Sequence, residues 1–438
     1  MNVSDESLRD EILHSDVFLC SKEYLYSKGY AVDWAVSATV NALYKLNYKS
    51  FTAEYVTSFP NEKNIGWLYS AQICKFGSKL MFTPLLARNW RFYDTESGKW
   101  DKAAIPEYAT PETESDVAFT TGVIFRECII FLPGNTGVFA KYNINNNSFE
   151  YYYNLSEKFK KHNVNSTAPA CWEFDEHDGK LYITSPRWNI ITVLDMYSMK
   201  FQFEEVGFFE NRYLGIAFCN DRFWLTKCNA PLSSIHWKEG FVSWNPDTGE
   251  CNEYNDIPVK QTVDGQGFNA IVAADGYVFA FPHCADAIIK INPETNEMRR
   301  FELNPHFDYH ERKSKYYTFG KNCPFIAIVP HKDDKVFVVT SYDYSTMIID
   351  LKTGNCEERI KWRVNGIEHL LARLNHRASK PWAEDLFVTE EDFIKYVADG
   401  QIPAFDKEQV DYYCSVNINS DGSCGEKIHE YVMSIIDG

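Results

Sequence analysis

The sequence has 438 residues, of which 45% are hydrophobic and 16% aromatic, so the chain can bury a sizeable core. Its formal net charge is −17, and this negative field repels nucleic-acid backbones and anionic membrane surfaces. The first residues lack a signal-peptide pattern, and no apolar run reaches the length of about 18 residues that a membrane span needs. We therefore expect neither nucleic acid nor a membrane as a partner.

The cysteines indicate a reducing compartment. The chain has 12 cysteines at irregular spacings without a CxxC pair, and many of them lie in apolar, strand-like runs. Free cysteine behaves as a small buried hydrophobic residue, and disulfides are rare in the cytosol. We expect a cytoplasmic protein with free thiols and no zinc site held by four cysteines.

A repeated turn divides residues 15–361 into units of about 50 residues, a period typical of repeat folds. In each turn, an Asn or Asp is followed three residues later by Ser, Thr or Asn, and an Asx side chain can accept a hydrogen bond from the backbone two residues on. The seven turns begin at Asn47, Asp94, Asn143, Asp195, Asn245, Asn292 and Asp350, and they end at Ser50, Ser97, Asn146, Ser198, Thr248, Thr295 and Thr353. We expect each turn to join two antiparallel strands.

Four strands are expected in each unit. The third strand precedes the turn and the fourth, outer strand follows it, as in FAKYN and FEYYYN. The apolar second strands are, in chain order, EYLYS, LMFTP, IIFLP, LYITSP, FWLTK, VFAFP and VFVVTS. A first strand rich in small residues, which suits convergence on a central axis, is expected in SAQICKF, FTTGVIF, TAPACWEF, GIAFC, FNAIVA and PFIAIV. In the first unit this strand is poorly defined, near VFLCS.

Four strands repeated seven times predict an all-β fold, a seven-bladed β-propeller over residues 15–361. Six or eight blades are the alternative, because the first unit is poorly defined. Stretches such as VFAFPHCADAIIKINPETNEM resemble blades of the propeller superfamily that includes YncE-like, NHL-repeat and virginiamycin-B-lyase-like proteins. This resemblance implies the architecture alone and carries over no catalytic residue.

Residues 362–438 are predicted to form a mainly helical C-terminal extension. The segments GIEHLLARLNH, EEDFIKYVADG and EKIHEYVMSII have helical periodicity. Capping-box spacings at Thr389 and Ser423 are typical of helix starts.

A ligand is expected on one side of the propeller, where the loop after each second strand and the connection to the next blade both emerge. Arg next to Trp, as in ARNW and PRWN, could bind a carboxylate or a sugar hydroxyl while the indole stacks on an apolar face. The predicted ligand-binding residues are Arg88, Trp90, Arg187, Trp188, Trp237, His283, Asp286, Tyr342 and Tyr344. The structural alternative is that these aromatic residues cover blade edges and that the arginines pair with surface carboxylates.

Three histidines of neighbouring loops form a candidate metal site. His283 follows the second strand of the sixth unit, and His306 and His310 lie in the connection that follows that unit. On a helical turn, His306 and His310 would point the same way, and with His283 they could bind zinc or another divalent ion. General acid–base catalysis by one of these histidines is a separate hypothesis.

Two functions follow from these expectations. The first is a binding module, without a required cofactor, that recognises a peptide, a glycan or a partner protein at the loop-rich channel mouth. The alternative is a lyase or hydrolase with a His-centred, metal-dependent site on the same side. Motifs of familiar hydrolases, metalloproteases and nucleotide-binding proteins are absent from the sequence. The sequence leaves the oligomeric state open.

Overall fold

The computed structural model describes residues 34–36, 42–47, 52–62, 68–113, 116–153, 170–228, 240–259, 267–283, 285–309, 324–330, 334–340, 346–360, 363–365 and 429. The described residues form 28 β-strands in seven four-stranded sheets and one short 3-10 helix, η1 (Glu107–Ala109). This confirms an all-β, propeller-like fold. No helix in these ranges is long and apolar enough to span a membrane. Within the predicted helical extension, residues 362–438, the structure describes Arg363–Asn365, which form a strand rather than a helix, and His429, which is helical.

The chain divides into two compact units, one of Met1–Val17, Ser37–Gly66 and Trp362–Gly438, the other of Phe18–Val36 and Trp67–Lys361. The second unit contains six complete antiparallel sheets, whose strands run in chain order from the first to the fourth. The first three sheets are β4 (Tyr69–Phe76), β5 (Lys79–Pro84), β6 (Asn89–Asp94) and β7 (Lys99–Ala104); β8 (Phe119–Phe125), β9 (Cys128–Pro133), β10 (Val138–Asn143) and β11 (Ser148–Tyr153); and β12 (Phe174–His177), β13 (Lys180–Ile183), β14 (Ile190–Asp195) and β15 (Lys200–Glu205). The next three are β16 (Tyr213–Cys219), β17 (Arg222–Lys227), β18 (Phe241–Trp244) and β19 (Cys251–Tyr254); β20 (Phe268–Ala274), β21 (Tyr277–Pro282), β22 (Ile288–Ile291) and β23 (Met298–Phe301); and β24 (Phe325–Pro330), β25 (Lys335–Thr340), β26 (Thr346–Asp350) and β27 (Cys356–Ile360).

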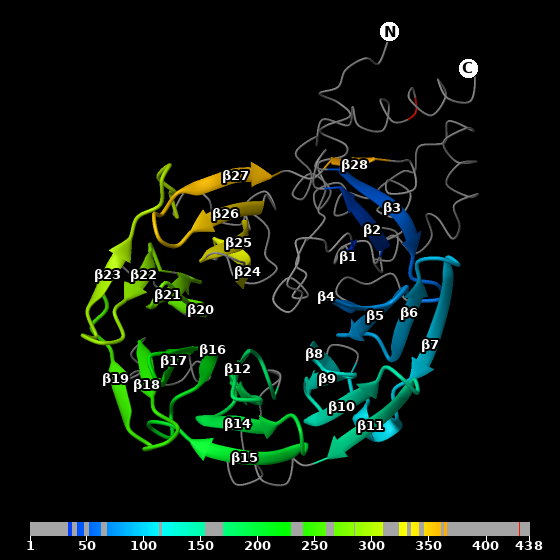
Figure 1. Cartoon of the computed structure of the whole chain (residues 1–438), viewed down its shortest axis with the longest axis horizontal. Helices are drawn as coiled ribbons and strands as arrows, with labels where there is room; N and C mark the ends of the chain where they lie inside the picture. Colours follow the sequence, from blue (N-terminus) through cyan, green and yellow to red (C-terminus); the bar gives the residue numbers. More distant parts are fainter. Residues whose placement is uncertain are drawn as a thin grey trace, which may run out of the picture. The chain divides into compact units, whose positions relative to one another are not determined.

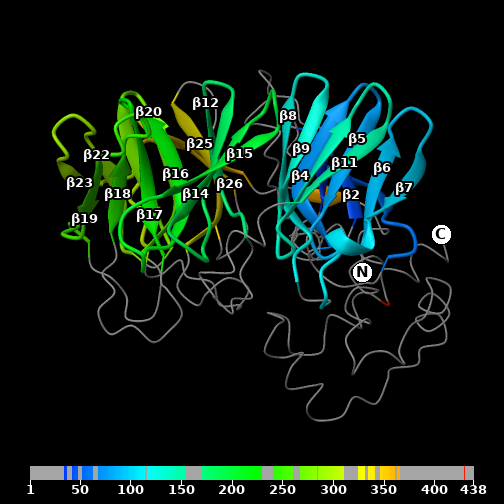
Figure 2. The same cartoon turned by 90° about the horizontal axis from the view of Figure 1, so that it is seen from below.

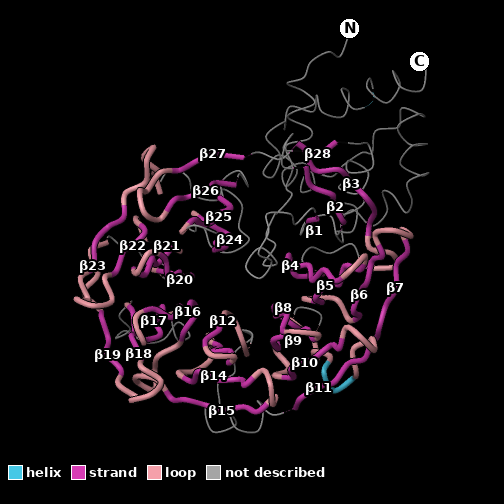
Figure 3. Tube along the Cα trace, viewed as in Figure 1, coloured by secondary structure: helices cyan, strands magenta, loops and turns pink. Residues whose placement is uncertain are grey.

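Each sheet of this unit packs face to face on the next. Figure 1 shows the six sheets following one another in chain order, with the first strand of each innermost and the fourth outermost, and Figure 3 traces the strands that alternate with short loops. Five apolar clusters each join two consecutive sheets, for example Val242 and Trp244 with Tyr182 and Ile191. The second strands β9, β17 and β21 are buried on both faces because a sheet covers each side, which explains their continuous apolar sequences.

Six of the seven predicted Asx turns are confirmed. They join the third strand to the fourth in every sheet of the second unit, and the Asx oxygen accepts hydrogen bonds from the backbone N–H groups two and three residues on, over 2.7 to 3.3 Å. The remaining turn, from Asn47 to Ser50, extends beyond the described residues. We call the side of the unit with these turns the turn face, and the opposite side, which carries η1 and the connections between sheets, the loop face (Figure 2).

The first strands of neighbouring sheets approach closely, as the small residues predicted. A Cβ atom on Gly215 of β16 would lie 2.9 Å from the backbone nitrogen of Ile271 on β20. Real Cβ atoms do not approach backbone this closely, so glycine is required for the two strands to meet.

The third unit departs from the prediction at its first strand. TAPACWEF was expected to form it, but β12 begins at Phe174. Ala170 and Cys171 instead donate backbone hydrogen bonds to Gly134 (2.8 Å) and Pro133 (3.3 Å) in the preceding sheet. The tertiary contact with that sheet, rather than strand propensity, decides where the strand begins.

The first compact unit contains β2 (Ala42–Asn47), β3 (Thr52–Ser58) and β28 (Arg363–Asn365). The strands β2 and β3 are antiparallel, and β28 pairs in parallel with β3 through Arg363 and Thr52, Val364 and Ala53, and Asn365 and Glu54. The sequence predicted β3 as the outer strand of its unit, and it did not predict that the distant segment β28 pairs along its outer edge. The segment YAVDWAVSATV was expected to be the loop after the second strand of the first unit, but it contains the short strand β1 (Trp34–Val36). The expected strands near VFLCS and EYLYS lie outside the described residues.

Candidate functional site

Backbone hydrogen bonds connect the loops of the loop face from sheet to sheet. The N–H of Ala118, just before β8, donates to the carbonyl of Leu85, just after β5, over 2.7 Å. Gly134 then donates to Ala118, and Ala170 to Gly134, both over 2.8 Å. These bonds hold the loops after the second strands against the connections between sheets, so side chains on this face have defined positions.

Arg88 holds two of these loops together. Its guanidinium donates to the carbonyls of Leu86 (3.0 Å) and Ala87 (3.5 Å) in its own loop, and to Thr113 (2.6 Å) in the connection between β7 and β8. The donors that were predicted to bind a ligand therefore bond to backbone carbonyls of the protein.

Trp90 lies in the core between the first two sheets of the second unit and has no exposed surface. Its ring centre is 4.5 Å from that of Phe131 and 4.9 Å from that of Phe149, and its Nε1–H donates to the hydroxyl of Tyr151 over 3.0 Å. Burial raises the pKa of Tyr151 to about 12. The indole N–H thus has its acceptor inside the core, and a ligand has no access to the ring in this structure.

Arg187 and Trp188 are also part of the packing. Trp188 is 7% exposed and belongs to the apolar cluster between the second and third sheets. Burial lowers the pKa of Arg187, and it raises that of the neighbouring Cys171 thiol. The Arg187 charge partly offsets the shift at Cys171. A thiol with a raised pKa is a poor nucleophile, so this pair offers no reactive cysteine.

His283 and Asp286 follow β21 on the loop face. The backbone N–H of His283 donates to Gly267 over 2.9 Å. Asp286 forms an ion pair with Arg300 of β23, Nη1 to Oδ1 over 3.0 Å, while Arg300 Nη2 donates to the Asp286 carbonyl over 3.0 Å. The Asp286 side chain is only 10% exposed. Its carboxylate therefore links the loop to the outer strand of the same sheet.

The predicted metal site is only partly within the described residues. His306 is exposed. His310, and Cys284 next to His283, lie outside the described residues. Within the described ranges, no group of three or more His, Cys, Asp or Glu residues is arranged to hold a metal ion. The three-histidine site stays a prediction, as does the enzyme built on it. Trp237, Tyr342 and Tyr344 likewise fall outside the described residues.

Two adjacent phenylalanines outside the predicted site are among the four exposed large apolar residues in the described part of the chain, and one of them, Phe208, is the most exposed of the four. Phe208 is 67% exposed and Phe209 is 54% exposed. Both lie in the connection from β15 to β16, residues 206–212, which we call the aromatic loop. Large apolar side chains are normally buried, so an adjacent exposed pair is informative. The sequence signal that could have indicated this pair is the dipeptide FF in the polar segment EEVGFFENR, between two predicted strands.

A hydrogen-bonded turn, together with backbone hydrogen bonds at both ends, holds the aromatic loop in place. The N–H of Asn211 donates to the Phe208 carbonyl over 2.9 Å and closes a β-turn. Val206 donates to Asn189 over 2.9 Å, and Tyr213 donates to Ser185 over 3.1 Å. Both ends of the loop are thus bonded to the loop between β13 and β14.

A buried polar network supports the loop from beneath. Lys227 Nζ lies 3.1 Å from Glu253 Oε2 and also donates to Asn255 Oδ1, and the Lys227 and Glu253 side chains are only 4% and 15% exposed. Asn211 Nδ2 donates to Glu253 Oε1 over 2.6 Å. The Tyr213 hydroxyl donates to the Val206 carbonyl over 2.8 Å, and burial raises the pKa of this tyrosine. Buried charges of this kind are stable only when they are paired and hydrogen-bonded.

Gly207 allows the loop to lie against this network. Its φ is +63°, a left-handed conformation that favours glycine, and a Cβ atom there would lie 2.7 Å from Asn211 Nδ2 and 2.9 Å from the Tyr213 hydroxyl. Arg212, 6% exposed, donates through Nη1 to the carbonyls of Phe209 and Asn211, both over 2.7 Å. Burial lowers the pKa of Arg212. The loop is therefore preorganised, with both phenylalanines outside.

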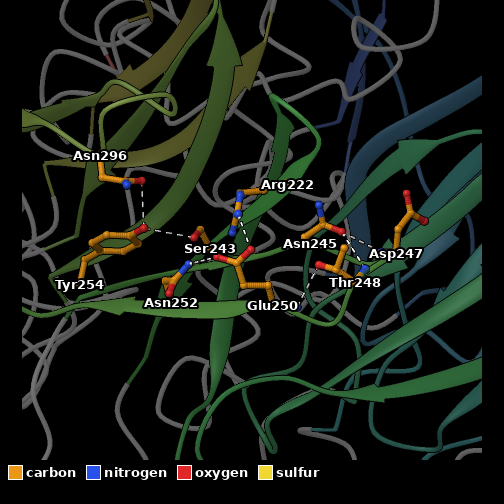
Figure 4. A network of polar contacts seen from close by, with 9 residues as sticks. All are labelled: Arg222, Ser243, Asn245, Asp247, Thr248, Glu250, Asn252, Tyr254 and Asn296. Carbon is orange, nitrogen blue, oxygen red and sulfur yellow. Dashed lines mark hydrogen bonds and ion pairs between the residues drawn. The ribbon is translucent and has the colours of Figure 1, made fainter.

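On the turn face of the β16–β19 sheet, polar side chains bond to one another (Figure 4). Arg222 pairs with Glu250 over 2.7 Å, and Asn252 donates to the same carboxylate over 2.9 Å. The Tyr254 hydroxyl donates to Asn296 Oδ1 in the next sheet over 2.9 Å. These groups bond to one another across strands and sheets, in contrast to the exposed apolar rings of the loop face.

Comparison with known proteins adds no family and no function. No family model matches the sequence, and no curated protein matches it. Among solved structures, the extracellular domain of BT4673 from B. thetaiotaomicron is similar, with a TM-score of 0.44 and 9% identity over 72% of this chain and 36% of that chain. A chain of a mitotic checkpoint complex is similar with a TM-score of 0.44 and 10% identity over 70% of this chain and 81% of that chain. This chain thus spans only about a third of the BT4673 domain's length, and neither match assigns an activity or a partner.

Proposed function

We propose that this protein is a binding module that recognises a partner protein or peptide on its loop face. The observation that carries the proposal is the pair of exposed phenylalanines, Phe208 and Phe209, on a loop whose backbone is held by a buried network. Aromatic side chains on a rigid support are typical centres of protein interfaces, because little conformational entropy is lost when they bind.

Of the two other exposed aromatic residues, one lies on the loop face and the other is partly covered. Tyr108, which is 56% exposed, lies in η1 of the connection between β7 and β8, also on the loop face. Tyr197, 60% exposed, lies on the turn face, but its ring packs against Phe125 and under the guanidinium of Arg126. Tyr197 is therefore covered partly by its own chain, whereas Phe208 projects from it.

A selection from a random peptide library against the immobilised full-length protein tests this proposal. We expect peptides that are enriched by the wild type to be lost with a Phe208→Ser/Phe209→Ser variant and kept with Tyr197→Ser, the control on the turn face. Absence of any enrichment, or enrichment that survives the double substitution, would refute the proposal.

We also propose that the complete architecture is a seven-bladed propeller followed by a mainly helical extension of residues 362–438. The support is the number of sheets, the repeated turn and the pairing of β28 with β3. Val364→Pro removes a backbone donor in β28 and should lower the Tm, whereas Val364→Ala keeps the donor and should have a smaller effect. Equal Tm values for the two variants would contradict a structural role of β28.

A further inference from the structure

The charge around the aromatic loop selects among partners. Glu204 and Glu205 end strand β15, directly before the loop, and Glu210 lies within it, and all three are exposed. Two described cations that bond to the loop or to the network below it are buried, because Arg212 is 6% exposed and Lys227 has a side chain that is 4% exposed. The exposed side chains from Glu204 to Glu210 are therefore apolar at Phe208 and Phe209 and acidic before and after them in the sequence.

The buried cations are also bonded within the protein. Lys227 lies against Glu253, and the Arg212 guanidinium donates to carbonyls of the loop. They hold the loop in place, and Glu204 and Glu210 are exposed negative charges that a partner meets. The chain as a whole, with a net charge of −17, adds a long-range field of the same sign.

We propose that residues 204–210 bind a peptide segment of a partner protein in which lysine or arginine residues flank an apolar side chain. The apolar group would pack on Phe208 and Phe209, and the cations would lie near Glu204 and Glu210. A partner cation near the exposed Phe209 ring adds a cation–π attraction, as Arg212 already does within the protein at 6.0 Å from that ring centre. Complementary charge accelerates association and excludes acidic competitors.

This inference rests on the proposed function but makes a separate prediction about partner chemistry. Sequences that the full-length protein selects from the random library should be enriched in Lys and Arg next to Leu, Phe or Trp, and depleted in Asp and Glu. The affinity of a selected peptide is then measured by fluorescence polarisation, at low and at high salt, for wild type and variants.

Two pairs of substitutions separate the apolar from the charged contribution. Phe208→Ala/Phe209→Ala should abolish measurable binding. Glu204→Gln/Glu210→Gln should weaken it about tenfold, as expected for two solvent-exposed ion pairs, and should reduce its salt dependence. The matched control is Glu294→Gln/Glu297→Gln, which removes the same charge from an exposed turn of another sheet and should leave the affinity unchanged.

Several outcomes would overturn the inference. If selected peptides need Phe208 and Phe209 but show no preference for basic residues, or if the Glu204/Glu210 variant binds like the Glu294/Glu297 control, the inference fails while the proposed function stands. If no selected peptide depends on the phenylalanines, both fail. If phosphatidylcholine vesicles bind in a Phe208-dependent manner and peptides do not, the loop contacts a lipid surface, and both proposals are wrong.

Discussion

Trp90 and Phe208 are both large aromatic residues close to loops of the loop face, yet their surroundings are opposite. Trp90 has no exposed surface because the sheet of β8–β11 covers it, whereas Phe208 is 67% exposed. The neighbour in space, and not the residue type or its position in the repeat, decides whether an aromatic side chain is buried in the fold or stays exposed. Substitutions should therefore separate the two regions into one that determines stability and one that determines binding.

The largest effect is expected at Trp90. Trp90→Ala leaves a large cavity between two sheets and should lower the free energy of unfolding by about 3–5 kcal/mol, measured by urea denaturation. Tyr151→Phe removes only the acceptor of the indole N–H and should cost about 1–3 kcal/mol. If Trp90→Ala were as stable as the wild type, this would contradict the burial of Trp90 between two sheets and with it the difference between the two regions.

The next effect concerns the support of the aromatic loop. Lys227→Met leaves the Glu253 carboxylate without its buried cation and should cost about 3 kcal/mol. The double variant Lys227→Met/Glu253→Leu removes both charges and should recover much of that loss. A double variant less stable than Lys227→Met would show that the ion pair is not the relevant contact. Urea denaturation of both variants measures this.

A smaller effect is expected at Asp286, which the sequence placed in a ligand site. Asp286→Asn weakens the ion pair with Arg300 and should cost about 1 kcal/mol or less, because Arg300 is partly exposed. Arg300→Met also removes the hydrogen bond to the Asp286 carbonyl and should cost more. The loss in the double variant should be smaller than the sum of the two single losses, since both changes remove the same ion pair. Additive losses in a double-mutant cycle would contradict this assignment.

The Asp and Asn turns should respond differently to acid. Hydrogen bonds from the backbone N–H groups of Ser97 and Ser198 hold the pKa values of Asp94 and Asp195 below the usual value. The stabilisation is thus present above the unfolded pKa of about 4 and is lost as the pH falls through the lower folded pKa. As the pH falls below about 4, the variant Asp94→Asn/Asp195→Asn should lose less stability than the wild type. Tm measured against pH checks this. The opposite change, Asn245→Asp, should increase the loss.

The smallest effect on stability is expected at the aromatic loop itself. Phe208→Ser removes an exposed side chain and should change the free energy of unfolding by no more than about 0.5 kcal/mol. Urea denaturation of Phe208→Ser beside Trp90→Ala gives the direct comparison. A large loss at Phe208 would mean that its ring packs within the protein, and the proposal of an interface there would lose its support.

Much of the architecture could be predicted from the sequence, because its signals are local. An Asx side chain bonds to backbone groups two and three residues on, so Asp94, Asn245 and Asn292 mark their turns without help from the rest of the fold. Continuous apolar runs such as VFAFP mark strands that are buried on both faces. The candidate site could not be predicted in the same way, since Trp90 and Asp286 were chosen by residue type and loop position alone.

The sequence by itself determined most of the strands, six turns and the repeat, since each depends on contacts within about 50 residues. Only the tertiary structure decided that β28 pairs with β3, that Trp90 is enclosed by the neighbouring sheet, and that Phe208 and Phe209 stay outside. These outcomes depend on groups far apart in the chain. The network of Asn211, Lys227 and Glu253 is an example, because its members come from three segments that meet only when the sheet has formed.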